Sequence, residues 1–502
     1  MIRLNEAEYR DKTTACWLGK NIGGTLGMPF EWRRQANNVS FYTQALDGAP
    51  VPNDDLDIQL VWLMALEEQG IDLDAHTLAE YWSIYLSPHW SEYGISKSNM
   101  RIGLPPPLCG SFDNKFKHSC GAFIRSEIWA CIAPGTPSLA VRYAYEDAIL
   151  DHGDGEGTYA EVFTAAIESA AFVIPDIRKL LAIGLSYIPS DCAVAKAANA
   201  VIEAFDAGQS WQDIREMILR DYRGKAQVSS KEDLEKGFNT GEVGFDVPSN
   251  IAIVVLGLLH GEKGDFDKMI CTTVNCGEDT DCTAATVGSI YGIIHGCAGI
   301  PEKWIKPIGR GLKTCCINIG DMAGLLPGDI DALTLRVESV MRQVVERRGK
   351  KLGISISNQA STGIPEWQKM LGSGADEAIY KNMNKVAYKF PFYSIVLDYD
   401  GKATIKAGEE KRIKVKVLSD YGRVQANISV RIYAPEGWKV SPQNGVVHCI
   451  PGWYENIFPE FELSFHAGES IAASNRCTME LTIEGRPGAM LVTITLINGN
   501  LL

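Results

Sequence analysis

The chain has 502 residues, with 48 Lys and Arg against 62 Asp and Glu, and therefore carries a formal charge of −14 at pH 7. This length exceeds that of one ordinary compact core, so we expect two domains. The acidic balance argues against a nucleic-acid partner, because a large nucleic-acid footprint needs clustered positive charge.

The cysteines and the N-terminal residues bear on the compartment. There are 13 cysteines and no Cys-x-x-Cys pair, which indicates neither a disulfide framework nor a zinc ribbon. The first residues, MIRLNEAEYRDK, are charged and lack the apolar core of a secretory signal. Both features favour a reducing, cytoplasmic location.

Apolar residues at helical spacing dominate the chain from about Asn5 to about Lys350, which predicts a mostly α-helical domain over 1–352. Several of the periodic segments end in Gly, as helix C-termini often do. The predicted helices cover 56–70, 78–86, 159–174, 191–208, 211–222 and 249–261.

An uncharged run from Thr283 to Ile300 is long enough to raise the question of a membrane span. Its glycines, threonines and histidine favour a buried helix instead, so no membrane partner is expected. The glycines recur every four residues, which gives the helix one bare face where a neighbouring backbone can come close. They are Gly288, Gly292 and Gly296.

The periodicity changes to two in the last part of the chain. Segments 412–418, 427–433, 478–484 and 491–497 alternate apolar and polar residues, with turns rich in Gly, Pro, Asp and Asn between them. This pattern predicts an immunoglobulin-like β-sandwich of about seven strands. The predicted sandwich covers 386–502, and residues 353–385 are expected to form a connector.

Two clusters of acids stand where a loop is expected to become a helix. In PNDDLDIQL, Asn53 precedes Asp54 and Asp55, and in NCGEDTDCTAATVG, Asp279 and Asp281 flank one threonine. Helix capping explains each cluster taken alone, because an Asn cap and acids in the first turn suit the positive end of the helix dipole. If the two helix ends converge, their four carboxylates form a set of hard ligands for Mg²⁺, Mn²⁺ or Ca²⁺.

Three blocks of sequence resemble the ADP-ribosylglycohydrolase family over roughly residues 10–345. They are GKNIGGTLGMPFEW for the family's Gly-rich first helix ending in Glu, NDDLDIQL for its Thr-Asp-Asp-Thr segment, and EDTDCTAATVGSIYG for its Gly-Asp-Thr-Asp-Thr-x-Ala-Ala segment. A weaker fourth match is LDHGDGEGTYAEVFTAA, in which His152 stands at the place of the family's substrate-loop histidine.

The resemblance implies an all-α fold whose central cleft holds two divalent cations, usually Mg²⁺, beside the ribose of the substrate. Asp54 and Asp55 would bind these ions from the first helix end, and Asp279 and Asp281 from the second. Glu31 would be a gating or coordinating acid, or would pair with a neighbouring arginine. The catalytic candidates are thus Glu31, Asp54 and Asp55. The residue types agree with ribosyl cleavage, in which carboxylates stabilise an oxocarbenium-like state and a metal-bound water is the nucleophile.

Three further residues are candidates for substrate contact. Asn53 offers a carbonyl oxygen where the family has Thr, and His152 is chosen for its place in the fourth block. Arg125 lies in a polar, Gly-containing stretch between helices and could contact a phosphate or sugar. The structural alternatives are a hydrogen-bonded loop histidine and an arginine paired with a nearby acid.

The chain departs from the family's motifs at further positions. Leu56 replaces the second Thr of the first acidic motif, Cys282 replaces the last Thr of the second, and Gly24 replaces the Asp that usually follows Gly in the first helix. A thiol is a poor ligand for Mg²⁺, so Mn²⁺ is the alternative ion. We expect Cys282 to turn away from the ions and to pack beneath the glycine-faced helix.

These features predict a divalent-metal-dependent glycohydrolase that cleaves an ADP-ribosyl or related ribofuranosyl linkage of a small molecule or a protein. Two alternatives stay open: a nucleoside or riboside hydrolase of the same fold, and a protein that binds ADP-ribose without cleaving it. The four intact aspartates favour an enzyme. The sequence indicates neither the leaving group nor the oligomeric state.

Overall fold

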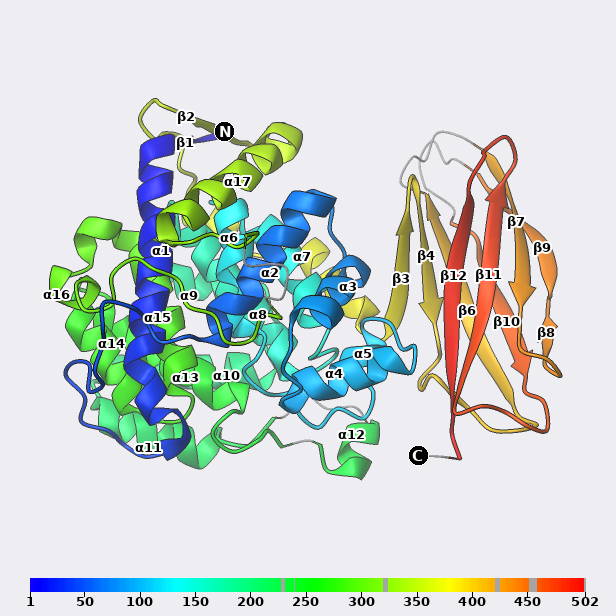
Figure 1. Ribbon diagram of the computed structural model, residues 1–502, viewed down its shortest axis with the longest axis horizontal. Helices are drawn as coiled ribbons and strands as arrows, with labels where there is room; N and C mark the ends of the chain where they lie inside the picture. Colours follow the sequence, from blue (N-terminus) through cyan, green and yellow to red (C-terminus); the bar gives the residue numbers. More distant parts are fainter. Residues whose placement is uncertain (227–230, 239, 319–323, 420–424, 451–457, 501–502) are drawn as a thin grey trace. The chain divides into compact units, whose positions relative to one another are not determined.

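The structure, a computed structural model, describes residues 1–502 except 227–230, 239, 319–323, 420–424, 451–457 and 501–502, and except the side chains at 32, 33, 232, 375 and 377. The chain divides into two compact units, whose elements are labelled in Figure 1. The first unit consists of Met1–Ile95 and Asp113–Tyr380, and the second of Ser96–Phe112 and Lys381–Leu502.

The first unit is helical, which confirms the helical region predicted from the apolar periodicity. Each of the six predicted segments forms a helix. The longer helices are α1 (Glu6–Gly27), α2 (Asp54–Gln69), α3 (Ala75–Tyr85), α4 (Ser91–Arg101), α7 (Pro137–Ala148), α8 (Glu156–Ala171), α9 (Ile177–Ser186), α10 (Ala193–Asp206), α11 (Trp211–Asp221), α13 (Val247–Gly261), α14 (Phe266–Asn275), α15 (Thr280–His295) and α17 (Ile330–Leu352). The shorter ones are η1 (Met28–Arg33), η2 (Phe123–Arg125), α6 (Glu127–Ile132), α12 (Lys231–Lys236), η3 (Cys297–Gly299) and α16 (Glu302–Ile305).

Helix α15 contains most of the uncharged run that the sequence predicts as a buried helix, although it ends at His295 and the run continues to Ile300. Its residues from Thr280 to Ile294 are all buried. Within the described part of the chain, no helix has both the length and the apolar character required to cross a membrane.

Helices α1 and α15 approach each other at backbone distance because glycines line both sides. A Cβ added to Gly23 would lie 2.1 Å from the carbonyl oxygen of Ala284, and one added to Gly288 would lie 2.3 Å from that of Gly19. The predicted bare face is therefore used at Gly288 and at Gly292, where an added Cβ would lie 2.1 Å from the carbonyl oxygen of Ala15. Gly296 instead ends the helix with a positive φ of 66°. The close contact fixes the C-terminal end of α1, and with it η1, beside the N-terminus of α15.

The chain after α17 packs on the helical unit. Strand β2 (Ile354–Ser357) pairs in parallel with β1 (Ile2–Asn5). It is followed by η5 (Trp367–Met370), α18 (Gly374–Glu377) and η6 (Ala378–Asn382). In η6, the ring of Tyr380 packs edge-on against Tyr159 at 5.1 Å between centroids. Residues up to Tyr380 thus belong with the helices, although the sequence pattern assigns 353–385 to a connector.

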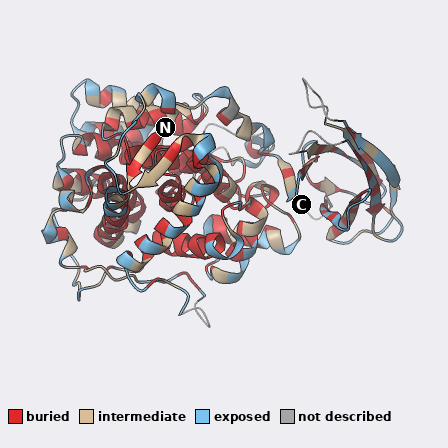
Figure 2. Ribbon diagram, turned by 90° about the horizontal axis from the view of Figure 1, so that it is seen from above, coloured by how far each residue is buried: buried red, intermediate tan, exposed pale blue. Residues whose placement is uncertain are grey.

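The second unit is rich in β-strands and contains two five-stranded sheets, with strand orders β3-β4-β6-β10-β8 and β5-β12-β11-β7-β9. Buried and more exposed residues alternate along β6, β7 and β11, and in the first half of β12, as predicted for these segments. Buried residues from both sheets form a single shared core (Figure 2). The strands are β3 (Lys385–Phe390), β4 (Tyr393–Asp398), β5 (Thr404–Ile405), β6 (Glu410–Ser419), β7 (Ala426–Tyr433), β8 (Lys439–Ser441), β9 (Asn444–Cys449), β10 (Glu460–His466), β11 (Ser474–Ile483) and β12 (Ala489–Asn498).

The second unit also contains Ser96–Phe112, a segment that the sequence pattern does not assign to it. This segment includes the last residues of α4 and the short helix α5 (Leu108–Ser111). Leu104 and Leu108 are 1% and 6% exposed and belong to the core shared by the two sheets. The hydroxyl of Thr495 in β12 donates to the carbonyl of Gly103 at 2.6 Å.

Candidate active site

The two acidic clusters stand at the N-termini of α2 and α15. Asn53 caps α2, because its side-chain oxygen accepts the backbone N–H of Asp55 at 2.9 Å. Asp54 is the first residue of α2, Asp279 is the N-cap of α15, and Asp281 lies in the first turn of α15. Both clusters therefore occupy the positive ends of helix dipoles, which favour negative charge.

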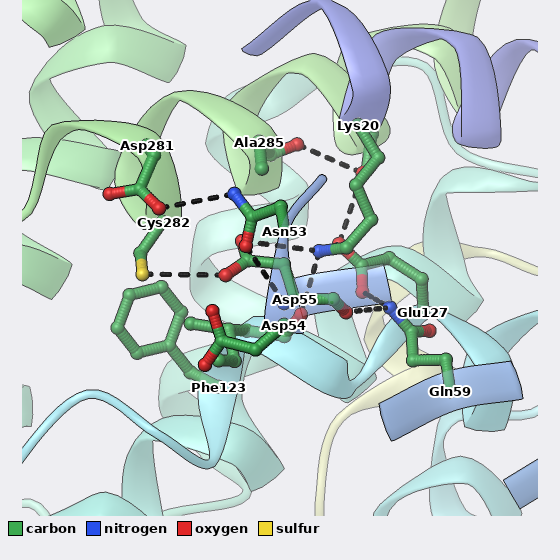
Figure 3. A network of polar contacts seen from close by, with 12 residues as sticks. Lys20, Asn53, Asp54, Asp55, Gln59, Phe123, Glu127, Asp281, Cys282 and Ala285 are labelled. Carbon is green, nitrogen blue, oxygen red and sulfur yellow. Dashed lines mark hydrogen bonds and ion pairs between the residues drawn. The ribbon is translucent and has the colours of Figure 1, made fainter. Parts of the chain in front are cut away.

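One hydrogen bond joins these two helix ends. The side-chain amide of Asn53 donates to Oδ2 of Asp281 at 3.1 Å (Figure 3). Carboxylate oxygens of Glu31, Asp279 and Asp281 lie within 4.8 Å of one another, and donor atoms of Asp55, Asp281 and Cys282 form a second group of the same size. The structure thus brings together acids that are more than 220 residues apart in the chain.

The carboxylates at this junction are buried and incompletely hydrogen-bonded. Asp55, Asp279 and Asp281 are 1%, 3% and 3% exposed, and one oxygen of each has no hydrogen-bond partner among the described residues. Burial, followed by the charge of Asp281, raises the pKa of Asp279 well above its usual range. Burial, followed by the charge of Asp54, raises the pKa of Asp281 to about 6. Crowded, buried carboxylates are costly unless a cation meets them, so this set of oxygen donors fits a hard divalent ion.

Asp54 and Glu31 stand at the wall of the adjoining cavity. The phenol of Tyr93 donates to Oδ2 of Asp54 at 3.0 Å, which orients that carboxylate. Glu31 comes from η1 and is half-buried, in contrast to the aspartates. Arg33, one partner considered for Glu31, has a side chain outside the described ones, and Arg34 lies 5.1 Å above the ring of Phe245.

Lys20 contributes a buried positive charge that sequence reasoning missed. It is 2% exposed, and its Nζ donates to Glu127 at 2.7 Å and to the carbonyl of Ile124 at 2.6 Å. The same ammonium lies 3.6 Å from Oδ2 of Asp55 (Figure 3). Burial alone would lower the pKa of Lys20, but the charges of Glu127 and Asp55 outweigh it and raise the pKa above its ordinary value. The sequence signal that could have revealed Lys20 is its position within the Gly-rich segment of α1. A lysine buried in such a segment needs acidic partners.

Glu127 connects Lys20 to the middle of α2. Its second oxygen accepts from the side-chain amide of Gln59 at 2.7 Å, and Gln59 in turn accepts the backbone N–H of Ile128 at 2.8 Å. Helices α1, α2 and α6 are therefore joined by charge-assisted hydrogen bonds directly behind Asp55.

Cys282 faces the acids, so the prediction that it turns away from them is wrong. Its thiol donates to Oδ1 of Asp55 at 3.4 Å, and it is one of the residues that line the cavity (Figure 3). The first turn of α15 directs this side chain across to α2, while the glycines further along α15 contact α1. Burial, followed by the charge of Asp279, raises the pKa of the Cys282 thiol, which favours the protonated form as a donor.

Arg125 does not have the open position expected of a substrate contact. It is wholly buried, and its guanidinium donates to Asp151 at 2.8 and 3.0 Å and to Asp147 at 2.9 Å. The indoles of Trp62 and Trp129 each donate to the other oxygen of Asp147 at 2.8 Å. Arg125 is not among the residues that line the cavity, so the structure favours its alternative reading as an ion-paired arginine.

His152 belongs to the same buried network. It is wholly buried, its Nδ1 lies 2.8 Å from Oδ1 of Asp151, and it too is not among the lining residues. The structure therefore places His152 behind the cavity wall, in agreement with the alternative of a hydrogen-bonded loop histidine rather than with a substrate contact.

A cavity of about 450 Å³ opens beside the two helix ends. Its size suits one drug-sized ligand. Acids line it together with four aromatic residues, which are Trp90, Tyr93, Phe116 and Phe245. The remaining lining residues are Met28, Glu31, Pro52, Asn53, Asp54, Ser91, Glu92, Ser119, Cys120, Gly121, Ile124, Asp279, Asp281, Cys282 and Cys315.

Comparison with known proteins identifies the helical part of the chain. The sequence model of the family described as ADP-ribosylglycohydrolase matches residues 5–339. An uncharacterized protein of Archaeoglobus fulgidus is 25% identical over 315 residues, which cover 60% of this chain and 92% of that relative. The family match spans both acidic helix ends, Glu31 and the residues that line the cavity. Because it also covers more than half of the chain, the protein belongs to the ADP-ribosylglycohydrolase family, a family of hydrolases.

Proposed function

We propose that this protein is a divalent-metal-dependent glycohydrolase that cleaves an ADP-ribosyl or related ribofuranosyl linkage. The observation that carries the proposal is the meeting of three buried aspartates, Asp55, Asp279 and Asp281, each with one oxygen that accepts no hydrogen bond from the described residues. Asp279 and Asp281 line a ligand-sized cavity, and Asp55 lies behind them beside Lys20. Burying these carboxylates costs free energy in the metal-free protein, and this cost is explained if they serve to hold cations. Family membership agrees with hydrolysis as the reaction.

Asp54, Asp55, Asp279 and Asp281 would hold two divalent cations, Mg²⁺ or Mn²⁺. When bound, such ions supply Lewis-acid chemistry and lower the pKa of a coordinated water. The thiol of Cys282 is a soft donor within reach of Asp55, and this favours Mn²⁺ over Mg²⁺ as the more tightly held ion.

The surrounding residues would position the sugar and its leaving group. Asn53 fixes the separation of the two acidic helix ends through its bond to Asp281, and Tyr93 orients Asp54. Half-buried Glu31 can hold or move a proton at the cavity wall, where an acid assists departure of the leaving group. The aromatic residues that line the cavity offer flat surfaces for a base or another planar group.

A panel of substrates tests the proposal. Purified protein is incubated with ADP-ribosylated amino acids, O-acetyl-ADP-ribose, nucleosides and nitrophenyl ribosides, with and without EDTA, and with Asp281→Asn as the matched variant. Release of a ribosyl product that EDTA abolishes and Mn²⁺ restores is the expected result. Binding of ADP-ribose without turnover of any substrate would instead identify a non-catalytic binding protein.

A nucleoside or simple riboside is the second candidate substrate, and the charge of the cavity favours it. Among the described residues that line the cavity there is no Lys or Arg, although a pyrophosphate usually meets basic side chains or backbone N–H groups. If the protein hydrolyses nucleosides faster than ADP-ribosyl compounds in the same panel, the substrate is a nucleoside or simple riboside.

A further inference from the structure

Cys315 and Cys316 meet Asp57 at the first turn of α2, beside the acidic site. The backbone N–H groups of Cys315 and Cys316 both donate to Oδ2 of Asp57, at 2.7 and 2.6 Å. The two sulfur atoms are 3.5 Å apart. Both sulfurs and one carboxylate oxygen of Asp57 lie within 4.8 Å of one another. A single carboxylate in the first turn of α2 therefore holds the backbone of the two adjacent cysteines.

One carboxylate oxygen of Asp57 accepts no hydrogen bond within the described part of the chain. The residue is wholly buried, and its Oδ1 has no hydrogen-bond partner among the described residues, whereas Oδ2 accepts two bonds. A buried carboxylate oxygen without a donor is costly, and the cost is removed if a cation binds there. The residues used in the proposed hydrolysis do not include Asp57, Cys315 or Cys316.

The donor types select a class of ion different from that of the neighbouring site. Thiolates bind soft and borderline cations, whereas carboxylates alone prefer hard ones. Two thiolates on one tetrahedral Zn²⁺, each about 2.3 Å from the ion, are roughly 3.8 Å apart. The sulfur separation of 3.5 Å is already close to this value, so binding requires little movement.

We propose that Asp57, Cys315 and Cys316 form a binding site for a thiophilic divalent cation, Zn²⁺ or Cd²⁺. The ion forms two metal–sulfur bonds and one bond to the carboxylate, and the two thiol protons pass to solvent. Cys316 is buried, but Cys315 is exposed and lines the cavity, so an ion would reach the site from the side of Cys315. An ion held there stands at the cavity wall without using the four aspartates of the hydrolytic site.

Titration of the full-length protein with Cd²⁺ tests this site. The protein is kept in a non-chelating reductant with excess Mg²⁺, which occupies hard carboxylate sites and gives no thiolate absorption. The ultraviolet absorption of the thiolate-to-cadmium charge transfer is recorded as Cd²⁺ is added. We expect saturation at one equivalent in the native chain, and loss of the band in Cys315→Ser/Cys316→Ser.

Single substitutions define the ligands. Cys315→Ser changes an exposed side chain, keeps the fold, and should reduce Cd²⁺ affinity at least about tenfold. Asp57→Asn retains an oxygen for the two backbone N–H groups and should weaken Cd²⁺ binding to a similar extent. Cys271→Ser in α14, distant in sequence and outside the cavity lining, is the matched control and should leave the titration unchanged.

Four results would overturn the proposal. Three concern the absorption band: a native protein without a saturable band, a band that persists in the double serine variant, and a band that is lost in Cys282→Ser instead. Unchanged Cd²⁺ affinity in Asp57→Asn would also overturn it, because the carboxylate is then not a ligand. Since binding is read spectroscopically with Mg²⁺ present, the outcome does not depend on whether the protein hydrolyses any ribosyl substrate.

Discussion

The side-chain amide of Asn53 donates to Oδ2 of Asp281 at 3.1 Å, and this bond holds the N-terminus of α2 against that of α15. Asn53 also caps α2 with its carbonyl oxygen, so one side chain satisfies a helix end and sets the spacing of two acidic clusters. The residue at the place of the family's Thr therefore has a structural use in this chain, since it both caps α2 and bonds to α15.

Asp281→Asn should abolish tight Mn²⁺ binding and leave the fold intact. The affinity measured by isothermal titration calorimetry should fall by more than the roughly 10- to 100-fold typical of residues that only support a ligand. In EDTA, the melting temperature should stay the same or rise, because a buried negative charge among like charges is removed. Glu203→Gln, on the exposed surface of α10, is the control. Unchanged Mn²⁺ affinity would take Asp281 out of the ligand set.

Lys20→Met should destabilise the protein strongly, because Glu127 then loses its buried cation. We expect the free energy of unfolding, measured by denaturant titration, to fall by about 3–5 kcal/mol. The double variant Lys20→Met/Glu127→Gln should recover part of this loss, since it leaves no unpaired charge on Glu127. If the double variant is no more stable than the single one, the ion pair at 2.7 Å does not account for the effect.

Gly23→Ala should push α1 away from α15 and thereby weaken Mn²⁺ binding at the acidic site. The added Cβ would lie 2.1 Å from the carbonyl oxygen of Ala284, and backbone on both sides cannot yield without moving a helix. We expect a loss of stability of about 1–3 kcal/mol together with weaker Mn²⁺ binding. Gly328→Ala, where an added Cβ meets nothing within 4 Å, should change neither quantity. Normal Mn²⁺ affinity in Gly23→Ala would show that the site tolerates this displacement.

The protein should become less stable as the pH is lowered, because a buried histidine is held in its neutral form. His118 is wholly buried and its Nδ1 accepts the backbone N–H of Glu156 at 3.1 Å. Burial, followed by the charge of Lys117, lowers the pKa of His118 to about 3. The unfolded chain binds this proton near its ordinary pKa of about 6.5, so the free energy of unfolding should decrease as pH falls from there towards 3.

His118→Gln provides the comparison for this pH dependence. Glutamine can accept the same N–H through its carbonyl oxygen but does not titrate. The plot of unfolding free energy against pH, from chemical denaturation in EDTA, should therefore be flatter below pH 6.5 in the variant than in the native chain. Parallel curves for the two proteins would assign the acid sensitivity to other groups.

Removal of the β-rich unit should make the remaining chain insoluble. In a truncation after Tyr380, the side chains of Leu104 and Leu108 lose the core formed by the strands and become exposed. Sedimentation and size-exclusion chromatography should show aggregation. Leu104→Ser/Leu108→Ser within the truncated chain should restore soluble protein that still binds Mn²⁺. A soluble truncation without these changes would mean that Ser96–Phe112 refolds by itself.

Several features of the site could be read from the sequence because they are local. Asn53 beside Asp54 and Asp55, and Asp279 beside Asp281, mark helix N-termini through short-range capping and dipole effects, and the structure has both. The helices and the strands follow from the spacing of apolar residues, which is a property of neighbouring positions. The shared motifs then indicated that the two acidic clusters belong to one cleft.

Tertiary structure alone decided which polar residues face the cavity and which are buried behind it. Arg125 and His152 lie in polar stretches that resemble a binding loop, yet Asp147 and Asp151, more than twenty residues from Arg125, enclose the guanidinium. Lys20 and Cys282 likewise acquire their partners, Glu127 and Asp55, across the packed helices. Local sequence determines whether a residue can be a helix cap, a ligand or an ion, because that depends on its own chemistry and nearest neighbours. Whether it is solvated, paired or aimed at a ligand depends on burial by distant segments, which arises only when the helices pack.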